Sequence, residues 1–580
     1  MNDNCAPLYL GLDLSTQQLK GVVINSQRHV VCEIGIVFDD EFPEFQTTNG
    51  RYVDGDIVTA PVLMWVAAVD LLMGRLAATG LASRVRGISG AAQQHGSVYW
   101  RRQGVDAIRQ LDPEVSLRQQ LGNSSAFAVV NSPIWEDSST SKQCEELEQC
   151  AGSASELARI TGSTAFERFT GPQIAKVRAT QPQAWHQVSR ISLVSSFVAS
   201  LLVGDVVPID CSDASGTNLY DIQAGKWSQK LCDSIDPQLV QYLGPKVTLA
   251  NEIVGQLSPY FAQRYGVASC PVVAFTGDNP SAFAGFESMF AVSGHSAAVI
   301  SLGTSDTVLF PLEKYPYSLD TRSVAMQHLD GHVLQHPTDP GRYIAMLCYK
   351  NGSLARDWVR QRSLGAGSTW TDFSNAADIV PMAPMAFGFY YLSTEILPRA
   401  KGVYRFEQHT DGSIVGPSGS TYRQVDRFSS DSTVCWNDAR AIIESQIMSM
   451  CVDYAHKGSH AMTGVAITGG ASSNPALQQA IADILGVPVF ATAEQATASV
   501  EIKAPAMPAY GGAVRALERL DPVPDTSSTL EPPGSKYILQ AVCSPNSDRH
   551  GVYAQALADF EFLREFVSQS TTLTCADSSE

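Results

Sequence analysis

Two hairpin patterns that lie half a chain length apart constrain the fold more than any other feature. Residues 8–24 hold two apolar runs on either side of the turn Asp13-Leu14-Ser15-Thr16. Residues 297–310 hold two more around Gly303-Thr304-Ser305. Apolar runs separated by a short polar turn are typical of two antiparallel strands. Because a unit repeated along a chain indicates a repeated structural plan, we predict two halves of the same design.

The composition indicates a large folded interior and an acidic surface. The chain has 580 residues, too many for one hydrophobic core. Charged residues make up 17% of it, below the usual share of about 25%, which excludes a disordered chain. A net charge of −18 and the lack of a basic stripe argue against nucleic-acid and anionic-lipid partners. We therefore expect any anionic ligand to be held locally, by backbone N–H groups, helix termini or a metal ion.

The cysteines and the apolar stretches predict a cytoplasmic protein. The twelve cysteines are scattered, with no C-x-x-C pair, so neither structural zinc nor a disulfide framework is expected. The N-terminus, Met1-Asn2-Asp3-Asn4, is polar and unlike a secretory signal. The most apolar stretch, Val194–Ile209, contains Asp205 and is too short to span a bilayer, so we expect no membrane partner.

The remaining pattern predicts alternating strands, helices and insertions. We expect a helix at 60–78, a strand at 85–89, a buried helix or strand at 191–203, strand–turn–helix at 270–286, surface insertions at 315–345 and 400–435, a linker at 521–535 and a closing helix at 553–567.

The two hairpin turns are candidate phosphate sites. The chain has neither a Walker sequence nor a G-x-G-x-x-G that opens a helix, so a nucleotide would need another device. Successive N–H groups and hydroxyls in such a turn suit phosphate oxygens, and Asp13 could hold Mg²⁺. Taken alone, each turn is better explained as an ordinary Asx or Ser turn. Two turns facing each other would clamp a polyphosphate from both sides.

A third glycine turn follows the apolar run Val465–Ile467 and precedes a helix at 476–485. Gly469 and Gly470 would let a base or sugar rest against the backbone. The alternative is a plain strand-to-helix turn in which Asn474 caps the helix and Pro475 is its first residue, and both interpretations can hold together.

Asp278 lies at a predicted helix entrance. Pro280 suits the first helical position, which makes Asn279 the expected cap. The helix dipole would keep the Asp278 carboxylate ionised, either as a base in a cleft or as a capping group only. His95, after Gln93-Gln94, could bind sugar hydroxyls or be structural, and Arg168 could orient a polar substrate or pair with a surface acid.

Taken together, these stretches resemble the FGGY family of carbohydrate kinases, and within it the members that act on the ketopentose D-xylulose. The resemblance rests on segments 11–17, 90–97, 191–197, 276–279, 301–305 and 468–474, in this order along the chain. The chain departs from the first family signature at Ala179, three residues after Lys176, where the family usually has tryptophan.

The resemblance implies an α/β fold of two actin-like, ribonuclease H-like domains that flank a central cleft. It implies a sugar-binding domain at 8–288, a nucleotide-binding domain at 289–568 and a flexible tail at 569–580. It also implies site residues: Asp278 as the general base; His95, Arg168, Asp278 and Asn279 on the sugar; Asp13 as the metal-associated acid; Ser15, Thr16, Gln17, Gly303, Thr304 and Ser305 on the phosphates; Gly469, Gly470, Asn474 and Trp358 on the nucleoside part of ATP.

The activity implied by the resemblance is transfer of the γ-phosphoryl group of ATP to the 5-hydroxyl of D-xylulose, with Mg²⁺. We expect Asp278, with a pKa near the usual value of about 4, to accept the proton late in the reaction. The alternatives are a family member acting on ribulose, gluconate or glycerol, an actin-like or chaperone-like ATP-binding module without a sugar substrate, and an inactive regulatory protein. A monomer and a homodimer both remain open.

Overall fold

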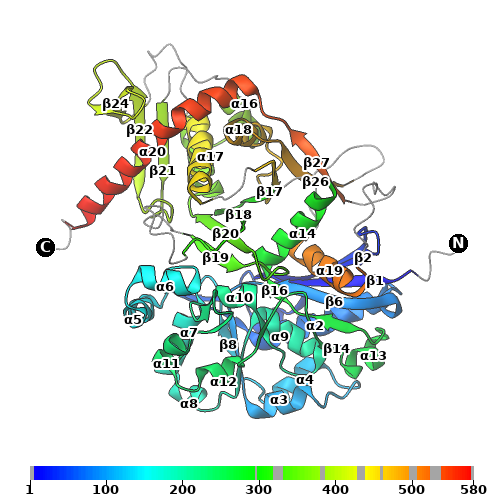
Figure 1. Cartoon of the computed structure of the whole chain (residues 1–580). Coiled ribbons are helices and arrows are strands. Elements are labelled where there is room, and N and C mark those ends of the chain that lie inside the picture. The colour runs from blue at the N-terminus through cyan, green and yellow to red at the C-terminus, as the bar shows by residue number, and fades with distance from the viewer. Residues whose placement is uncertain are drawn as a thin grey trace.

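Both predicted hairpins form, and each belongs to a seven-stranded mixed sheet in the computed structural model (Figure 1). The structure describes residues 6–293, 297–317, 331–378, 386–427, 438–457, 462–494, 506–522 and 537–576.

The two sheets repeat one strand plan. The first runs β14 (Ile253–Gln256), β15 (Pro271–Val273), β6 (Val85–Ala92), β1 (Leu8–Leu14), β2 (Gln18–Asn25) and β3 (Val30–Val37), with β16 (Thr276–Gly277) also paired to β6. The second runs β27 (Tyr537–Cys543), β26 (Val489–Glu494), β25 (Gly464–Thr468), β17 (Ala297–Leu302), β18 (Asp306–Leu312), β20 (Tyr343–Tyr349) and β19 (His332–Gln335). In each, the hairpin strands are antiparallel and the first of them is parallel to its other neighbour. The predicted repeat of one plan is therefore confirmed.

Helices cover both sheets. On the side of the first sheet lie α2 (Val62–Ala78), α5 (Ser141–Ala151), α6 (Ala154–Thr161), α7 (Thr170–Thr180), α9 (Val194–Val203), α10 (Cys211–Ser215), α11 (Gln229–Ile235) and α12 (Leu239–Leu243). On the side of the second lie α15 (Ser353–Leu364), α16 (Trp370–Asp378), α17 (Asp438–Lys457), α18 (Pro475–Leu485) and α20 (Ser547–Ala576). None of the helices in the described ranges is long and apolar enough to cross a bilayer.

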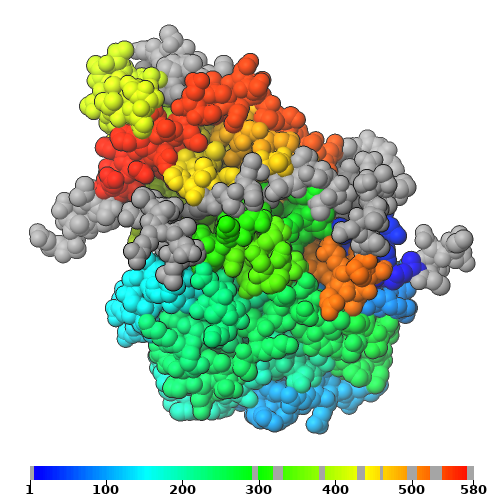
Figure 2. Space-filling model, in the orientation of Figure 1, coloured from blue at the N-terminus to red at the C-terminus, as the bar shows by residue number. Residues whose placement is uncertain are grey.

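Two helices join the halves. The helix α14 (Asp278–Ser293) follows the first sheet, and α19 (Met507–Leu520) returns from the far end of the chain to pack on β1, β6 and α14. Figures 1 and 2 show α19 in orange among the first-half elements. One buried cluster combines Tyr9 of β1, Phe286 of α14, Val299 of β17 and Val514 of α19. The two sheets therefore share a core.

Close backbone packing seats α19. A Cβ atom at Gly11 would lie only 1.8 Å from the carbonyl oxygen of Ala509 and 2.4 Å from the nitrogen of Ala513. A side chain at Gly11 would therefore hold α19 away from β1, so this strand position requires glycine.

Several predicted elements need correction. The stretch 315–345 is not a surface insertion throughout, because β19 and the start of β20 belong to the second sheet and all of β19 is buried. The glycines and prolines around β19 hide this short strand in the pattern. Segment 400–435 carries β22 (Gly402–Gln408), β23 (Ile414–Val415) and β24 (Thr421–Val425), which form a small sheet with β21 (Ala386–Tyr391).

Other boundaries are close to those predicted. The helix at 60–78 is α2, and the stretch 191–203 is a strand, β9 (Arg190–Leu193), followed by α9. The closing helix, α20, is longer than predicted at both ends. The predicted linker 521–535 lies almost wholly outside the described residues.

Candidate active site

Two carboxyl groups meet where the central strands of the first sheet end. Asp13 lies near the end of β1, and Asp278 directly follows β16, which pairs with the last residues of β6. Because β1, β16 and β6 are parallel, their carboxyl ends lie at one edge, where ligands bind in many α/β sheets. Burial, and then the negative charge of Asp278, raises the pKa of Asp13 to about 7, although Lys20 opposes this. The Oδ1 atom of Asp13 has no hydrogen-bond partner among the described residues.

Two predictions about Asp278 are wrong. Its pKa is not near the ordinary value: the surrounding protein desolvates the carboxyl and raises its pKa to about 6, although hydrogen bonds from Asn279 oppose the shift. The helix also begins two residues earlier than expected, at Asp278 and not at Pro280, so Asn279 is inside it and is not the cap. The Asn279 side-chain amide donates to Asp278 Oδ1 and to Gln94 Oε1, both at 3.1 Å.

Two further buried acids adjoin Asp278. Asp210 caps α10 by accepting from the N–H groups of Ser212 and Asp213, and it accepts from Thr276 Oγ1 at 2.8 Å. Asp213 accepts from Ser195 Oγ at 2.5 Å. Burial raises the pKa of both acids, and Asp278 adds to the shift of Asp213. Sequence reasoning missed this pair, although the spacing Asp-x-x-Asp after an apolar run is a capping pattern that could have indicated it.

A buried arginine from the second half of the chain acts on Asp210. Arg515 of α19 donates to the carbonyl of Gly90 and to Ser281 Oγ, each at 2.7 Å. Burial lowers its pKa to about 10, a value that still leaves the guanidinium charged at neutral pH, and its charge lowers the pKa of Asp210. The second half thus supplies a positive charge to the acidic edge of the first sheet.

His95 is held as a neutral ring. It follows β6 with a φ of 72°, stacks on Phe169 with a centroid distance of 4.4 Å, and bonds the Gly216 carbonyl through Nδ1 at 2.8 Å. Burial, and then Arg168, lowers the pKa of His95 to about 3. A neutral ring that donates from Nδ1 leaves Nε2 as an acceptor, which suits a sugar hydroxyl.

Arg168 reaches across to the second sheet. Its Nη2 lies 2.8 Å from Nε2 of His332 on β19, and its guanidinium stands 5.3 Å from the centre of the Phe166 ring. Sequence reasoning missed His332 because we assigned its segment to a surface insertion.

The first turn holds its predicted residues in a bonded hairpin. The Ser15 backbone N–H and its hydroxyl both donate to the Gln18 carbonyl at 3.0 Å. The indole N–H of Trp135 donates to Thr16 Oγ1 at 2.9 Å, which leaves the Thr16 hydroxyl proton free for another acceptor. Gln17 is exposed.

The second turn is braced by a buried ion pair. The Gly303 N–H donates to Asp306 Oδ1 at 3.1 Å, and Asp306 pairs with Arg356 of α15 at 2.7 Å. Because the Gly303 N–H is occupied, Thr304 and Ser305 are the residues of this turn left to supply donors to a phosphate.

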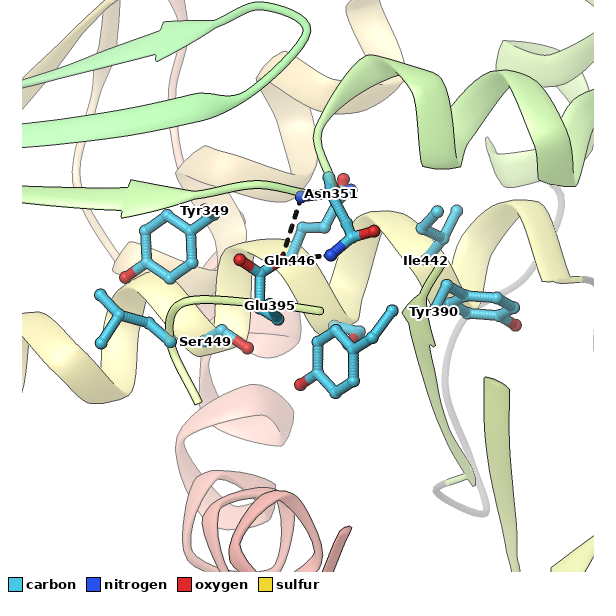
Figure 3. Close-up of a pocket in the computed structure, with 10 residues that line it drawn as sticks. Tyr349, Asn351, Tyr390, Glu395, Ile442, Gln446 and Ser449 are labelled. Carbon is cyan, nitrogen blue, oxygen red and sulfur yellow. Dashed lines mark hydrogen bonds between the residues drawn. The ribbon is translucent and has the colours of Figure 1, made fainter. Parts of the chain in front are cut away.

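A polar network continues behind this turn. Arg356 donates to Gln446, which donates to the Asn351 carbonyl. The Asn351 side chain in turn donates to Glu395 (Figure 3). The cavity in this network has a volume of about 20 Å³ and is lined by Tyr349, Asn351, Tyr390, Tyr391, Glu395, Leu397, Ile442, Ser445, Gln446 and Ser449. It has room for about one water molecule and none for a sugar or a nucleotide.

The glycines after β25 lie next to the second turn. A Cβ atom at Gly469, whose φ is 90°, would lie 2.4 Å from the Leu302 carbonyl oxygen, whereas one at Gly470 would meet open space. The side-chain oxygen of Asn474 accepts from Ala476 and Leu477, so the predicted helix cap is confirmed. Trp358, on α15, is partly buried, and the Arg362 guanidinium lies 5.1 Å from the centre of its ring.

The site suits a metal held largely by substrate. Nowhere in the described ranges do three or more His, Cys, Asp or Glu side chains gather as a metal cage. Mg²⁺ on a nucleotide needs only one or two carboxylates besides phosphate and water oxygens, so the unpartnered Asp13 oxygen fits it.

Comparison with known proteins shows the family of the chain. Models of the FGGY family of carbohydrate kinases match at residues 127–285 (N-terminal domain) and 298–500 (C-terminal domain). A xylulose kinase of Mus musculus is 42% identical over 488 residues, which are 83% of this chain and 82% of that protein. Xylulose kinase 2 of Arabidopsis thaliana is 39% identical over 506 residues, 85% of each protein.

The fold has a counterpart among solved structures. The crystal structure of the xylulose kinase from Rhodospirillum rubrum matches with a TM-score of 0.73 at 13% identity, over 97% of this chain and 100% of that one. Together with the two repeated sheets, this likeness confirms the predicted class, an α/β fold of two actin-like, ribonuclease H-like halves.

Proposed function

The chain belongs to the FGGY family of carbohydrate kinases, and we propose that it transfers the γ-phosphoryl group of ATP to the 5-hydroxyl of D-xylulose. The observation that carries the proposal is the state of Asp278. Its carboxyl is partly buried beside Asn279 and Gln94, and its pKa of about 6 keeps it ionised at neutral pH while making it a better proton acceptor than an ordinary aspartate.

The chain's own residues account for binding and proton transfer. His95 offers an acceptor at Nε2 and Arg168 offers donors, so the two suit a polyhydroxylated ketose. The transition state of phosphoryl transfer is loose, so positioning and charge stabilisation do most of the catalysis. Asp278 accepts the hydroxyl proton late in the reaction, when the oxygen–phosphorus bond makes that proton acidic.

The nucleotide is assigned to the two turns and the glycine loop. Ser15, Thr16 and Gln17 on one side, and Thr304 and Ser305 on the other, would hold the phosphates of ATP. Gly303, whose N–H is bonded to Asp306, would let a phosphate approach the backbone closely. Gly469, Gly470, Asn474 and Trp358 would contact the nucleoside. Asp13 would hold Mg²⁺, which neutralises phosphate charge when bound.

The test separates chemistry from binding. In the Asp278→Ala variant, phosphoryl transfer should fall by about 10³-fold, within the usual range for loss of a general base. Sugar affinity, measured by calorimetry, should fall far less, because His95, Arg168 and Asn279 remain. Asp54→Ala, at an exposed position of β4 (Tyr52–Asp54), is the control for a lost surface charge. Near-normal turnover of Asp278→Ala would exclude the base role.

The competing activities differ in what stimulates ATP consumption. A family member specific for ribulose, gluconate or glycerol would release ADP fastest with that compound in a substrate panel. An ATP-binding module of the actin or chaperone kind would hydrolyse ATP equally with and without sugar. The adjacent pair Asp278 and Asn279, bonded to Gln94, favours a sugar acceptor.

The proposal extends to the domains, the compartment and the oligomeric state. The sugar-binding and nucleotide-binding domains are assigned to 8–288 and 289–568, with α19 crossing to the sugar side. We expect the protein in the cytoplasm, as a monomer or a homodimer.

A further inference from the structure

One histidine of the second sheet lies among the residues assigned to the sugar. His332 is the first residue of β19 and is 3% exposed. The centre of its ring lies 4.7 Å from that of Phe166 and 4.9 Å from that of Phe169, the same ring on which His95 stacks. The two histidines and Arg168 therefore form one aromatic and cationic cluster drawn from both halves.

The hydrogen bond to Arg168 determines which ring nitrogen of His332 carries the proton. A guanidinium can only donate, so Nε2 of His332 accepts from Arg168. A neutral ring that accepts at Nε2 carries its hydrogen on Nδ1. The Nδ1 atom is buried and has no partner within the described part of the chain. An unpaired buried donor is costly, and its presence indicates a ligand or a bound water.

Two contacts hold β19 against the sugar side of the molecule. The Val333 N–H donates to the Gly162 carbonyl at 2.8 Å, and the Gln335 N–H donates to Ser215 Oγ at 3.1 Å. A Cβ atom at Gly162 would lie 2.2 Å from the Val333 carbonyl oxygen. Figure 1 shows β19 at the edge of the second sheet, next to α6 and α10.

The charge of Arg168 is left available. The structure pairs it with no carboxylate within 4.0 Å among the described residues. Its partners among the described residues are uncharged, namely His332, the Cys348 thiol and two phenyl rings. An arginine held by neutral partners keeps its remaining donors and its charge for a polar ligand.

We propose that His332 is a sugar-binding residue contributed by the nucleotide-side half, which orients Arg168 through Nε2 and donates its Nδ1–H to an oxygen of the ketopentose. This assignment rests on the proposed function. It makes the sugar site dependent on both halves, because an oxygen bound to His332 is also held next to His95 and Arg168.

Two substitutions each remove the role of one ring nitrogen. In His332→Gln the side-chain oxygen can reach the position of Nε2 and accept from Arg168, but no donor remains at Nδ1. In His332→Asn the amide stands near Nδ1 and the contact to Arg168 is lost. Each change should raise the KM for the sugar about tenfold, the effect of one lost hydrogen bond of about 1.4 kcal/mol, while the KM for ATP stays within about twofold.

Deoxy analogues of the sugar identify the bound oxygen. Calorimetric Kd values of wild type and His332→Gln are compared on D-xylulose and on each monodeoxy analogue. One of the analogues should have the same Kd for wild type and His332→Gln, because that analogue lacks the oxygen to which Nδ1–H donates. The control is His336→Gln: His336 is equally buried, bonds Glu287 through Nε2, and lies on the same segment outside the cluster. The His336→Gln substitution should leave the Kd of every sugar unchanged.

Each outcome is decisive. An unchanged sugar KM in His332→Gln, or the same Kd ratio on every analogue, would overturn the assignment and leave the proposed function standing. A wild-type protein that phosphorylates no sugar of the panel overturns the proposed function, and this assignment falls with it.

Discussion

At the scale of single residues, burial sets the chemistry of the site. The same loss of solvent that raises the pKa of Asp278 to about 6 and that of Asp13 to about 7 lowers the pKa of His95 to about 3. Desolvation disfavours whichever form is charged, so it moves acids up and bases down. The result is a neutral histidine and an aspartate that titrates close to working pH, and neither property follows from residue identity.

The raised pKa of Asp278 predicts the pH dependence of the activity. The base must be ionised to accept a proton, so kcat/KM for the sugar should fall about tenfold for each pH unit below about 6. Above about pH 6 the profile should be flat at saturating Mg-ATP, because a bound cation would keep Asp13 ionised. An ordinary aspartate would keep its activity down to about pH 4. The profile is measured from pH 4.5 to 8.5 at saturating Mg-ATP, with protein stability checked at each pH. A break at pH 4, or none, would contradict the role assigned to Asp278.

At the scale of elements, the second turn and α15 act as one unit. The Gly352 and Ser353 N–H groups donate to the carbonyls of Thr304 and Gly303, and Arg356, one turn further along, pairs with Asp306. Both members of the pair are 1% exposed. Removing one partner of such a pair leaves a buried charge without compensation, whereas removing both can be tolerated.

The Asp306–Arg356 pair predicts a non-additive mutational result. Asp306→Asn should lower the free energy of unfolding by about 3–5 kcal/mol and raise the KM for ATP, because the turn loses its brace. The double variant Asp306→Asn/Arg356→Met should recover part of that stability. The free energy of unfolding of each variant is measured by urea denaturation, and its KM for ATP is measured by steady-state kinetics.

An exposed pair provides the matched control for this experiment. Asp106 pairs with Arg102 at 3.1 Å on the exposed face of the helix α3 (Arg102–Ile108), and Asp106→Asn should cost less than about 1 kcal/mol. If Asp306→Asn lowered the free energy of unfolding no more than Asp106→Asn does, the Asp306–Arg356 pair would have no bracing role.

At the scale of the whole molecule, the two halves are not independent. The face of β1 and β6 beside α14 is covered by α19, a helix that arrives more than four hundred residues later in the chain. The shared cluster of Tyr9, Phe286, Val299 and Val514 lies between the two sheets. The charge of Arg515 and the ring of His332 also reach the sugar side from the second half.

This arrangement predicts that residues 1–293 do not fold alone. Without α19, the apolar face of β1 and β6 is exposed, so the fragment should aggregate, bind a hydrophobic dye and lack a cooperative unfolding transition. Joining residues 506–522 to it through a flexible linker should restore solubility and cooperative unfolding. A soluble, cooperatively unfolding fragment 1–293 would show that α19 is dispensable to the first sheet.

Local pattern was sufficient for the hairpins, the helix cap at Asn474, the repeated plan of the halves and the glycine turns, because neighbouring residues decide strand alternation, turn chemistry and capping. It was insufficient for the short strand β19, and therefore for His332, and for the acids Asp210 and Asp213, whose proximity to Asp278 depends on packing between distant segments. The pKa of Asp278 also depends on packing between distant segments. A sequence identifies the carboxyl, but only the folded chain determines how much water is removed from it.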